Sequence, residues 1–203
     1  MRYLQLAIKR IIDLVACAVM LIVVFPILLL TAFFVKVTSP GPIFFIQPRV
    51  GKNKKVYKMI KFRTMTGKPD EGATRWTSTD VARITPIGNF LRDYGVDELP
   101  QVINIIGGDM SIVGPRPPLP VQVETYSHEQ HKVFLMRPGV LSLAAIEGRR
   151  AISMDERIAL HVKYVENWSL MLDFRIIWRC LFIVLGRKNV TEVLTDDKGV
   201  IKK

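Results

Sequence analysis

The sequence predicts an α+β fold dominated by helices, with one long apolar helix followed by a compact globular part. Three observations lead to this prediction. Residues 14–35 carry no charge. The middle of the chain has short segments of strand and helix character, separated by Gly and Pro. A second apolar stretch, residues 170–185, contains charged residues. We therefore divide the chain into an N-terminal apolar helix (1–37), a globular unit (38–186) and a polar tail (187–203).

The uncharged run at residues 14–35 is long enough, at about 1.5 Å per residue, to cross a bilayer core about 30 Å thick. Pro26 lies near its centre and removes a backbone donor, so we expect a break or kink there. Cations lie on both sides of the run, and cations beside membrane helices favour the cytoplasm. A re-entrant helix, which enters and leaves the membrane by the same leaflet, would place the cations of both flanks in the cytoplasm. An ordinary kinked transmembrane helix would place the cations of only one flank there. The sequence leaves both topologies open. The flanking cations are Arg2, Lys9 and Arg10 before the run, and Lys36, Arg49, Lys52, Lys54, Lys55, Lys58, Lys61 and Arg63 after it.

The composition indicates a negatively charged partner. Lys and Arg total 29 against 18 Asp and Glu, a formal net charge of +11, while 49% of the residues are hydrophobic. An anionic membrane surface, phosphorylated substrates, or both, fit this combination. Nucleic acid fits less well, because the basic stretch has few aromatic residues and no zinc-finger or helix-turn-helix pattern is present. Both cysteines, Cys17 and Cys180, lie in apolar stretches, which favours free thiols and a globular unit that faces the reducing cytoplasm.

The stretch at residues 170–185 predicts an amphipathic helix. It contains Asp173, Arg175 and Arg179, so it is too short and too charged to span a membrane easily. A helix in the membrane interface, with Trp178 at headgroup depth, fits this composition. A buried core helix remains the alternative.

Short elements are predicted between these two helices. Residues 43–46 and 56–65 have strand character, and residues 67–80 are polar and predict a loop. Residues 86–92 predict a short helix whose last turn brings Arg92 close to Asp97.

An acidic pair opens the next segment, Asp97-Glu98-Leu99-Pro100-Gln101. Because Pro is favoured in the first turn, we expect a helix to begin near Pro100, with Asp97 and Glu98 at its positive end. Acids at such positions often only cap the helix. The pair by itself therefore leaves capping and catalysis open.

Cationic segments on either side of the pair favour catalysis. Downstream, Gly114-Pro115-Arg116-Pro117-Pro118 is a rigid loop that fixes the direction of one guanidinium, a group suited to bidentate phosphate contact. Upstream, Lys61 and Arg63 alternate with apolar residues on a predicted strand, which points both to one face.

These segments, taken in order, resemble the bacterial sugar transferase family, the monotopic phosphoglycosyl transferases. In size the chain is similar to the small members that consist of the catalytic unit alone. The resemblance covers most of the chain and rests on the apolar helix with its Pro, Gln47 to Gly51, Lys61-Phe62-Arg63-Thr64-Met65, residues 83–92 (RITPIGNFLR), residues 97–101 (DELPQ), residues 108–117 (GDMSIVGPRP) and Arg137-Pro138-Gly139.

The resemblance implies a chemistry for the acidic pair. Asp97 would attack the phosphorus attached to the sugar of a UDP-sugar, expel UMP and carry the phosphosugar until polyprenyl phosphate accepts it. Glu98 would assist by positioning metal or acceptor, and Mg²⁺ on Asp97 and Glu98 would offset the charge of the anionic reactants. A ternary complex with direct attack by the acceptor remains open. The implied substrate and phosphate contacts are Lys61, Arg63, Arg92, Arg116, Arg149 and Asp173.

The chain departs from the family pattern at two places. Phe25 precedes Pro26, where the family commonly has Ser, and residues 140–150 (VLSLAAIEGRR) replace the usual segment after Arg137-Pro138-Gly139. Gly148-Arg149 survives, so Arg149 stays a candidate for the nucleotide sugar, while the sugar itself is not specified.

The resemblance also implies a location and partners. The catalytic unit would lie on the cytoplasmic face of the bacterial inner membrane, in contact with phospholipid, UDP-sugar and polyprenyl phosphate. Its product would pass to downstream glycosyltransferases in the assembly of a glycan, O-antigen or capsule. The competing hypothesis is a non-catalytic membrane adaptor whose Lys and Arg bind anionic lipid and whose acids only cap helices.

Overall fold

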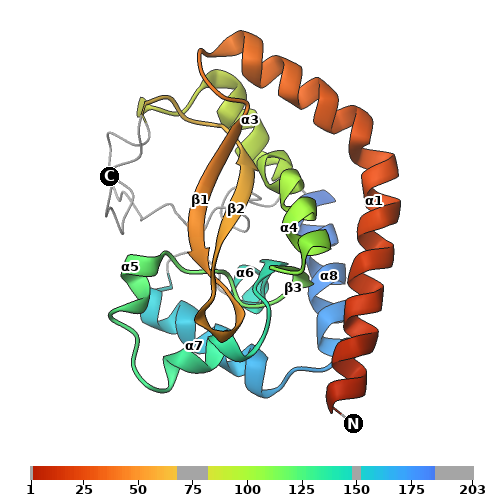
Figure 1. Cartoon of the computed structure of the whole chain (residues 1–203), viewed down its shortest axis with the longest axis vertical. Helices are drawn as coiled ribbons and strands as arrows, with labels where there is room; N and C mark the ends of the chain where they lie inside the picture. The colour runs from red at the N-terminus through yellow and green to blue at the C-terminus, as the bar shows by residue number, and fades with distance from the viewer. Residues whose placement is uncertain (1, 68–81, 148–151, 186–203) are drawn as a thin grey trace.

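The computed structural model describes residues 2–67, 82–147 and 152–185. These residues form a helix-dominated α+β fold, as the sequence predicts. A long helix runs along one side of the molecule, a β-hairpin lies across from it, and short helices fill the space between (Figure 1). The elements are α1 (Arg2–Thr38), β1 (Phe44–Val50), η1 (Lys52–Lys54), β2 (Val56–Phe62), α3 (Pro86–Asp93), η2 (Val96–Gln101), α4 (Val102–Gly107), β3 (Ser111–Val113), α5 (Pro120–Val123), η3 (Gln130–Leu135), β4 (Gly139–Leu141), α6 (Leu143–Glu147), α7 (Met154–Glu166) and α8 (Leu170–Leu185).

Helix α1 remains helical through Pro26, so the expected interruption is absent and the helix is continuous. Figure 1 shows α1 bending along its length, so that its C-terminal part arches toward α3. Loss of one backbone donor bends a helix without ending it where the flanking turns stay paired. Within the described residues, α1 is the one helix long and apolar enough to cross a membrane.

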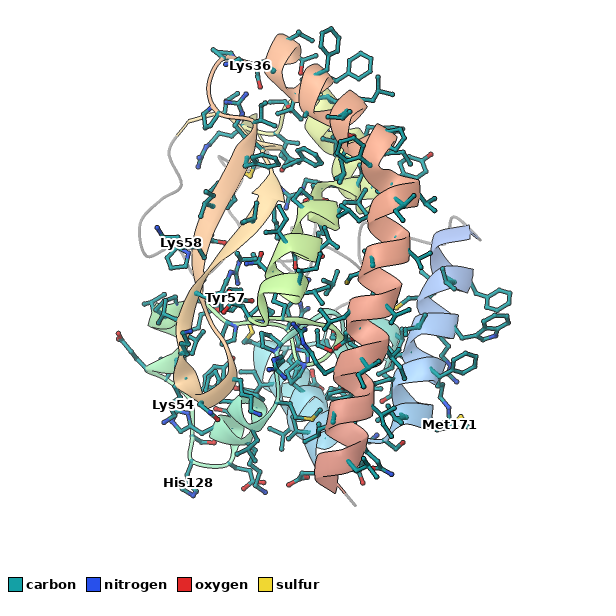
Figure 2. The ribbon with its side chains drawn as sticks, turned by 45° about the vertical axis from the view of Figure 1, so that its right-hand side comes forward. Lys36, Lys54, Tyr57, Lys58, His128 and Met171 are labelled. Atoms are coloured by element: carbon teal, nitrogen blue, oxygen red, sulfur yellow. The ribbon has the colours of Figure 1, made fainter. Side chains whose placement is uncertain are left out.

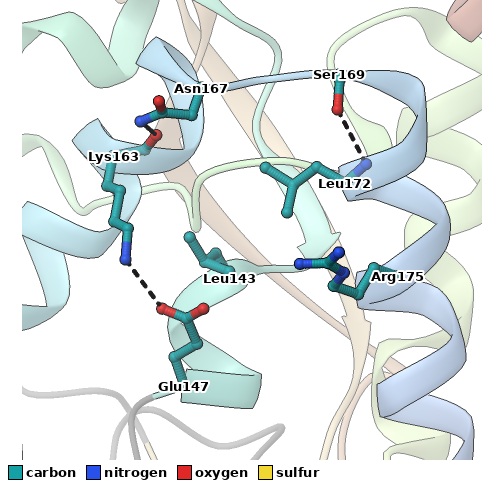
Figure 3. A pocket seen from close by; sticks show the side chains of 7 residues that line it. All are labelled: Leu143, Glu147, Lys163, Asn167, Ser169, Leu172 and Arg175. Atoms are coloured by element: carbon teal, nitrogen blue, oxygen red, sulfur yellow. Dashed lines mark hydrogen bonds and ion pairs between the residues drawn. The ribbon is translucent and has the colours of Figure 1, made fainter.

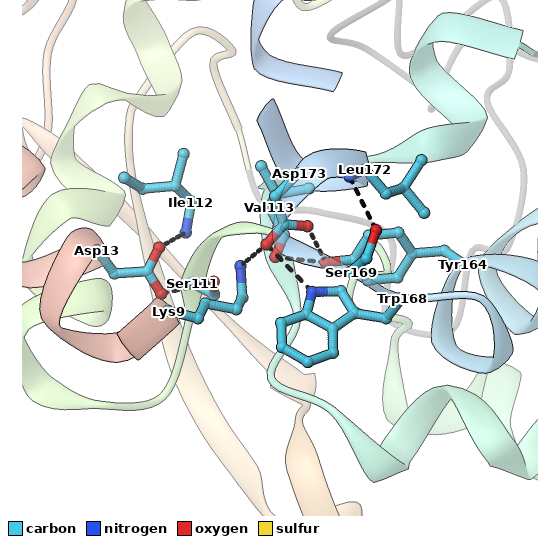
Figure 4. Close-up of polar contacts among 10 residues, drawn as sticks. All are labelled: Lys9, Asp13, Ser111, Ile112, Val113, Tyr164, Trp168, Ser169, Leu172 and Asp173. Carbon is cyan, nitrogen blue, oxygen red and sulfur yellow. Dashed lines mark hydrogen bonds and ion pairs between the residues drawn. The ribbon is translucent and has the colours of Figure 1, made fainter. Parts of the chain in front are cut away.

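Polar side chains in the first half of α1 hold it against the globular unit (Figure 4). The Lys9 ammonium lies 2.7 Å from the carboxylate of Asp173 on α8. One turn later, the Asp13 carboxylate accepts hydrogen bonds from the Ser111 hydroxyl at 2.7 Å and from the Ile112 N–H at 3.2 Å. These contacts bind α1 to β3 and α8, which are far away in the chain.

The hairpin of β1 and β2 is antiparallel, with Phe44 opposite Phe62 and Val50 opposite Val56. Strand β1 is longer than the predicted 43–46. Strand β2 ends at Phe62, earlier than the predicted residue 65, and Met65 instead forms an isolated bridge with Ile84. One further backbone bond in this register, from the Arg63 N–H to the Ile43 carbonyl at 2.9 Å, follows Phe62.

A second, two-stranded sheet joins β3 to β4 in parallel, with Ser111 opposite Gly139. The backbones approach closely where β3 ends, and a Cβ on Gly114 or Gly139 would overlap main-chain atoms of the other segment. Glycine is required at both positions for this contact. This close backbone contact places the loop after Gly114 beside β4.

Helices α7 and α8 close the core below these sheets. Tyr164 and Val165 on α7 pack with Ile176 and Cys180 on α8, and all four are buried. The predicted helix at residues 170–185 has the same bounds as α8. Its opposite side exposes apolar residues beside the exposed Arg175 and Arg179, namely Met171, Phe174, Trp178, Leu181 and Phe182.

Candidate active site

The acidic pair lies inside a tight turn. Gly95 adopts a left-handed conformation, with φ of +66°, and begins the 3-10 helix η2 that contains both acids. The helical segment therefore begins at Val96, earlier than the predicted start near Pro100, and α4 follows it directly. The predicted position of the acids at the N-terminal end of a helix is confirmed, because both lie in the first turn of η2. Asp97 and Glu98 are only 5% and 4% exposed. Acids this deeply buried require compensating charge nearby.

Glu98 receives that charge from two cations far away in the chain. The Lys61 ammonium on β2 lies 2.8 Å from Glu98 Oε1, and an Arg116 guanidinium nitrogen lies 3.0 Å from the same oxygen. The fold thus brings together the strand, the acidic turn and the Pro-Arg-Pro loop. The packing of β2 against η2 brings Lys61 to Glu98.

Arg92 completes the charged surroundings of the pair. The helix that carries it, α3, begins at Thr85, whose hydroxyl accepts a hydrogen bond from the Gly88 N–H at 2.9 Å and caps the first turn. Arg92 lies in the last turn, is buried, and its charge lowers the pKa of Asp97. The predicted approach of Arg92 to Asp97 is therefore present.

The two acids differ in protonation. Burial raises the pKa of Asp97 to about 6, and the negative charge of Glu98 adds to this increase, whereas Lys61, Arg92 and Arg116 oppose it. Burial also raises the pKa of Glu98, but Lys61 and Arg116 outweigh it and hold the pKa below its ordinary value. Glu98 is therefore the firmly ionised member of the pair, and Asp97 is the one that titrates near neutral pH.

Each acid also has one buried oxygen that accepts no hydrogen bond within the described residues, Asp97 Oδ1 and Glu98 Oε2. Unpaired carboxylate oxygens suit a hard divalent cation such as Mg²⁺. Among the residues that the structure describes, no group of three or more His, Cys, Asp or Glu side chains could hold a metal. A Mg²⁺ ion on this pair would complete its coordination with water and substrate phosphates, which is how Mg²⁺ commonly binds.

Two other predicted contacts lie elsewhere. Arg63 does not join Lys61 at Glu98, because its guanidinium donates to backbone oxygens at the end of α1 (Val35 at 3.3 Å, Ser39 at 2.7 Å and Pro40 at 2.9 Å). Arg149 lies outside the described residues.

Asp173 is the centre of a buried polar cluster at the start of α8. It accepts hydrogen bonds from the Tyr164 hydroxyl at 2.6 Å and the Trp168 indole N–H at 3.1 Å, in addition to its ion pair with Lys9 (Figure 4). These partners come from α1, from α7 and from the loop between α7 and α8. The contacts of Asp173 therefore join helices and include neither member of the acidic pair.

Arg10 is a contact of this region that the sequence analysis did not single out. Its guanidinium donates to the Ile105 carbonyl at 2.7 Å and the Ile106 carbonyl at 3.1 Å, at the end of α4. These are carbonyls that a helix end leaves without intrahelical partners. Since α4 follows directly on η2, Arg10 links α1 to the segment that carries Asp97 and Glu98. The sequence shows only a cation before an apolar run, which also fits a membrane flank.

A cavity of about 350 Å³ lies between α6, α7 and α8, away from the acidic pair (Figure 3). Lys163 and Glu147 face each other across it at 3.6 Å, and Arg175 points toward it from α8. Its other lining residues are Leu143, Asn167, Ser169 and Leu172.

Comparison with known proteins agrees with this geometry. Residues 4–187 match the family model described as "Bacterial sugar transferase". The chain is 38% identical over 175 residues to the "Uncharacterized sugar transferase EpsL" of Bacillus subtilis, covering 86% of this chain and 85% of that protein. It is 37% identical over 189 residues to the "Exopolysaccharide production protein ExoY" of Rhizobium meliloti, covering 85% and 83%.

A third relative carries a more specific name. The chain is 37% identical over 199 residues to the "UDP-glucose:undecaprenyl-phosphate glucose-1-phosphate transferase" of Caulobacter vibrioides, covering 94% of this chain and 71% of that protein. The family match extends over nearly the whole chain and includes every element around the acidic pair. The chain belongs to the bacterial sugar transferase family and is a phosphoglycosyl transferase.

Proposed function

We propose that this enzyme transfers a sugar 1-phosphate from a UDP-sugar to undecaprenyl phosphate, releasing UMP and forming a polyprenyl-diphosphate sugar. The observation that carries the proposal is the buried acidic pair, in which Asp97 keeps a free oxygen while Lys61 and Arg116 hold Glu98. UDP-glucose is the first donor to test, because it is in the name of the Caulobacter relative. Exopolysaccharide assembly is the proposed context, by likeness to ExoY.

The proposed reaction has two displacements at one phosphorus. A carboxylate oxygen of Asp97 attacks the sugar-bearing phosphorus, the bond to the bridging oxygen breaks, and UMP leaves with that oxygen. An oxygen of polyprenyl phosphate then attacks the same phosphorus and breaks its bond to Asp97, which regenerates the carboxylate. Asp97 suits this role because its free oxygen lies in a dry site, where a carboxylate is poorly solvated.

The surrounding cations reduce the repulsion between a carboxylate and a diphosphate. Lys61, Arg92 and Arg116 supply fixed positive charge around the pair. Glu98 neutralises part of that charge and holds Lys61 and Arg116 in place. Bound at the free oxygens of Asp97 and Glu98, Mg²⁺ would neutralise diphosphate charge.

Membrane attachment through α1 is part of the proposal, with the catalytic unit on the cytoplasmic face of the bacterial inner membrane. The apolar side chains of α1 are largely exposed, for example Ile22 at 79% and Val23 at 68%. The polar contacts of Lys9 tie one end of α1 to the globular unit, and those of Arg63 tie the other. Since both ends of α1 contact the same unit, we favour the re-entrant topology over a spanning helix.

Helix α8 is proposed to be a second contact with lipid. Its exposed side stacks Phe174 on Trp178, with ring centroids 6.2 Å apart, and sets Phe182 edge-on at 5.0 Å from Trp178. Figure 2 shows Met171 projecting outward beside α1, while Lys54 and Lys58 lie on the hairpin. An aromatic stripe beside Arg175 and Arg179 suits a membrane interface.

Replacing Asp97 with Asn separates the enzyme from an adaptor. The enzyme hypothesis predicts loss of UMP release, by at least about a thousandfold since the nucleophile is removed, with membrane binding intact. The matched control is Asp93→Asn, an isosteric change at an exposed acid on α3, which should keep most activity. Full activity of Asp97→Asn would rule out the proposed nucleophile.

A trapping experiment separates the covalent route from direct transfer in a ternary complex. Incubation with a UDP-sugar labelled in the sugar and its attached phosphate, without polyprenyl phosphate, should leave label on wild-type protein and none on Asp97→Asn. Turnover with acceptor but no labelled protein without it would favour the ternary complex.

A further inference from the structure

Arg49 on β1 reaches the loop that carries Arg116. It is 7% exposed, although it belongs to a strongly basic hairpin. One guanidinium nitrogen donates to the Pro117 carbonyl at 3.0 Å, and another donates to Gln47 Oε1 at 2.7 Å. A hydrogen bond from a buried charged donor to a backbone carbonyl is stronger than one between neutral groups. Arg49 is therefore built into the support of this loop.

Because of its composition, this loop is held mainly by hydrogen bonds that its backbone carbonyls accept. Three of the four residues from Pro115 to Pro118 are proline and have no N–H to donate. The Pro118 carbonyl accepts from the Val50 N–H at 3.0 Å, and the Pro115 carbonyl accepts from the Gly139 N–H at 2.9 Å. With the bond from Arg49, the loop is held from β1 on one side and from β4 on the other.

Arg116 lies between these attachment points, and its guanidinium meets Glu98 at 3.0 Å. We propose that Arg49 is a positioning residue that fixes the direction of Arg116 toward Glu98 and toward the diphosphate of the donor. The diphosphate part rests on the proposed function. Arg49 acts through Arg116, because its hydrogen bond to the Pro117 carbonyl holds the loop that carries Arg116.

One test measures the Arg116–Glu98 interaction without any turnover. The coupling between Arg116→Met and Glu98→Gln is measured by thermal denaturation, first with Arg49 present and then with Arg49→Met. We expect the coupling to fall at least severalfold when Arg49 is replaced, and to recover in part with Arg49→Lys, which keeps one donor for Pro117. An unchanged coupling would overturn the proposal, whether or not the enzyme is active.

A second test measures catalysis. Loss of Arg49 should reduce kcat/KM for UMP release on the order of ten- to hundredfold, since misdirected groups are costly in preorganised sites. In protein that already has Arg116→Ala, the same change should cause almost no further loss. Additive losses would overturn the proposal. If the wild type turns over no UDP-sugar while the coupling still falls, the proposed function fails and the positioning of Arg116 stands.

Arg63→Met is the matched control. Arg63 is buried like Arg49, at 8% exposed, and also donates to backbone carbonyls, but these belong to the end of α1. Its loss should lower stability and leave the Arg116–Glu98 coupling intact. A general loosening of the protein would reduce the coupling in both variants, and that result would also overturn the proposal.

Discussion

Asp97 and Glu98 are neighbours in the chain and almost equally buried, yet their environments separate their roles. Lys61 and Arg116 both contact one oxygen of Glu98, which keeps Glu98 ionised. Asp97 has a free oxygen and a pKa raised to about 6. An acid with that pKa is a better nucleophile toward phosphorus than its firmly paired neighbour, because less of its electron density is committed to cations.

The raised pKa predicts a pH dependence. Below about 6 Asp97 is protonated and cannot attack, so kcat/KM for UMP release should fall as the pH decreases through this value. Lys61 lowers the pKa of Asp97, and Lys61→Gln should therefore move the acidic limb to higher pH, in addition to lowering the rate. Initial rates across this pH range measure both effects. An acidic limb that stays in place in Lys61→Gln would contradict this assignment.

The two cations of the Lys61-Phe62-Arg63 segment should give different mutant phenotypes. Arg63→Met leaves buried carbonyls at the end of α1 without their donor, and should cost on the order of 3 kcal/mol of stability. Lys61→Met should mainly lower UMP release, because Arg116 still pairs with Glu98. Thermal denaturation beside activity assays tests this, and equal stability losses would argue against it.

At the scale of elements, α1 makes more polar contacts with the globular unit than a helix that only anchors the protein in a membrane requires. Lys9, Arg10 and Asp13 contact α8, α4 and β3 respectively. Helix α4 follows directly on the turn that contains Asp97 and Glu98. The contact of Arg10 with the end of α4 therefore links α1 to the acidic pair through one short helix. The helix that we propose to enter the membrane is thus also part of the support of the acidic pair.

The buried ion pair between α1 and α8 predicts a measurable coupling. Lys9→Met leaves Asp173 as a buried charge without its cation and should destabilise the protein by about 3–5 kcal/mol. The double variant Lys9→Met/Asp173→Asn should lose less than the sum of the single losses, since no charge then remains buried there. Thermal denaturation in detergent measures the stability of the wild type, the two single variants and the double variant, which together form a double-mutant cycle. Strictly additive losses would mean that the pair contributes no interaction of its own.

At the scale of the whole molecule, the re-entrant topology is testable. A single cysteine placed at residue 2, in protein whose Cys17 and Cys180 are replaced by Ala, should react with an impermeant thiol reagent only from the cytoplasmic side. The same result is expected for a cysteine at Lys54 on the hairpin, an exposed residue that Figure 2 shows on the globular unit. Labelling of residue 2 from outside the cell would establish a spanning helix.

The sequence predicted the elements whose cause is local. Helix α8 begins and ends where the apolar stretch does, and α3 begins at its Pro after a capping Thr85. It placed the start of the helical segment too late, near Pro100, because the left-handed turn at Gly95 that starts η2 is one of several conformations open to glycine. It left open whether Pro26 bends or breaks α1, since the surroundings of a proline decide between the two.

The sequence by itself determined which chemical groups the molecule has: an uncharged run of membrane length, an adjacent pair of acids, and cations in rigid or regular segments. Only the tertiary structure decided which groups meet. Lys61 reaches Glu98 while Arg63, two residues later, secures the end of α1, and Asp173 joins helices instead of the acidic pair. The physical reason is that each buried charge must find a partner, and the partners lie in distant segments that only the packing of the core brings together.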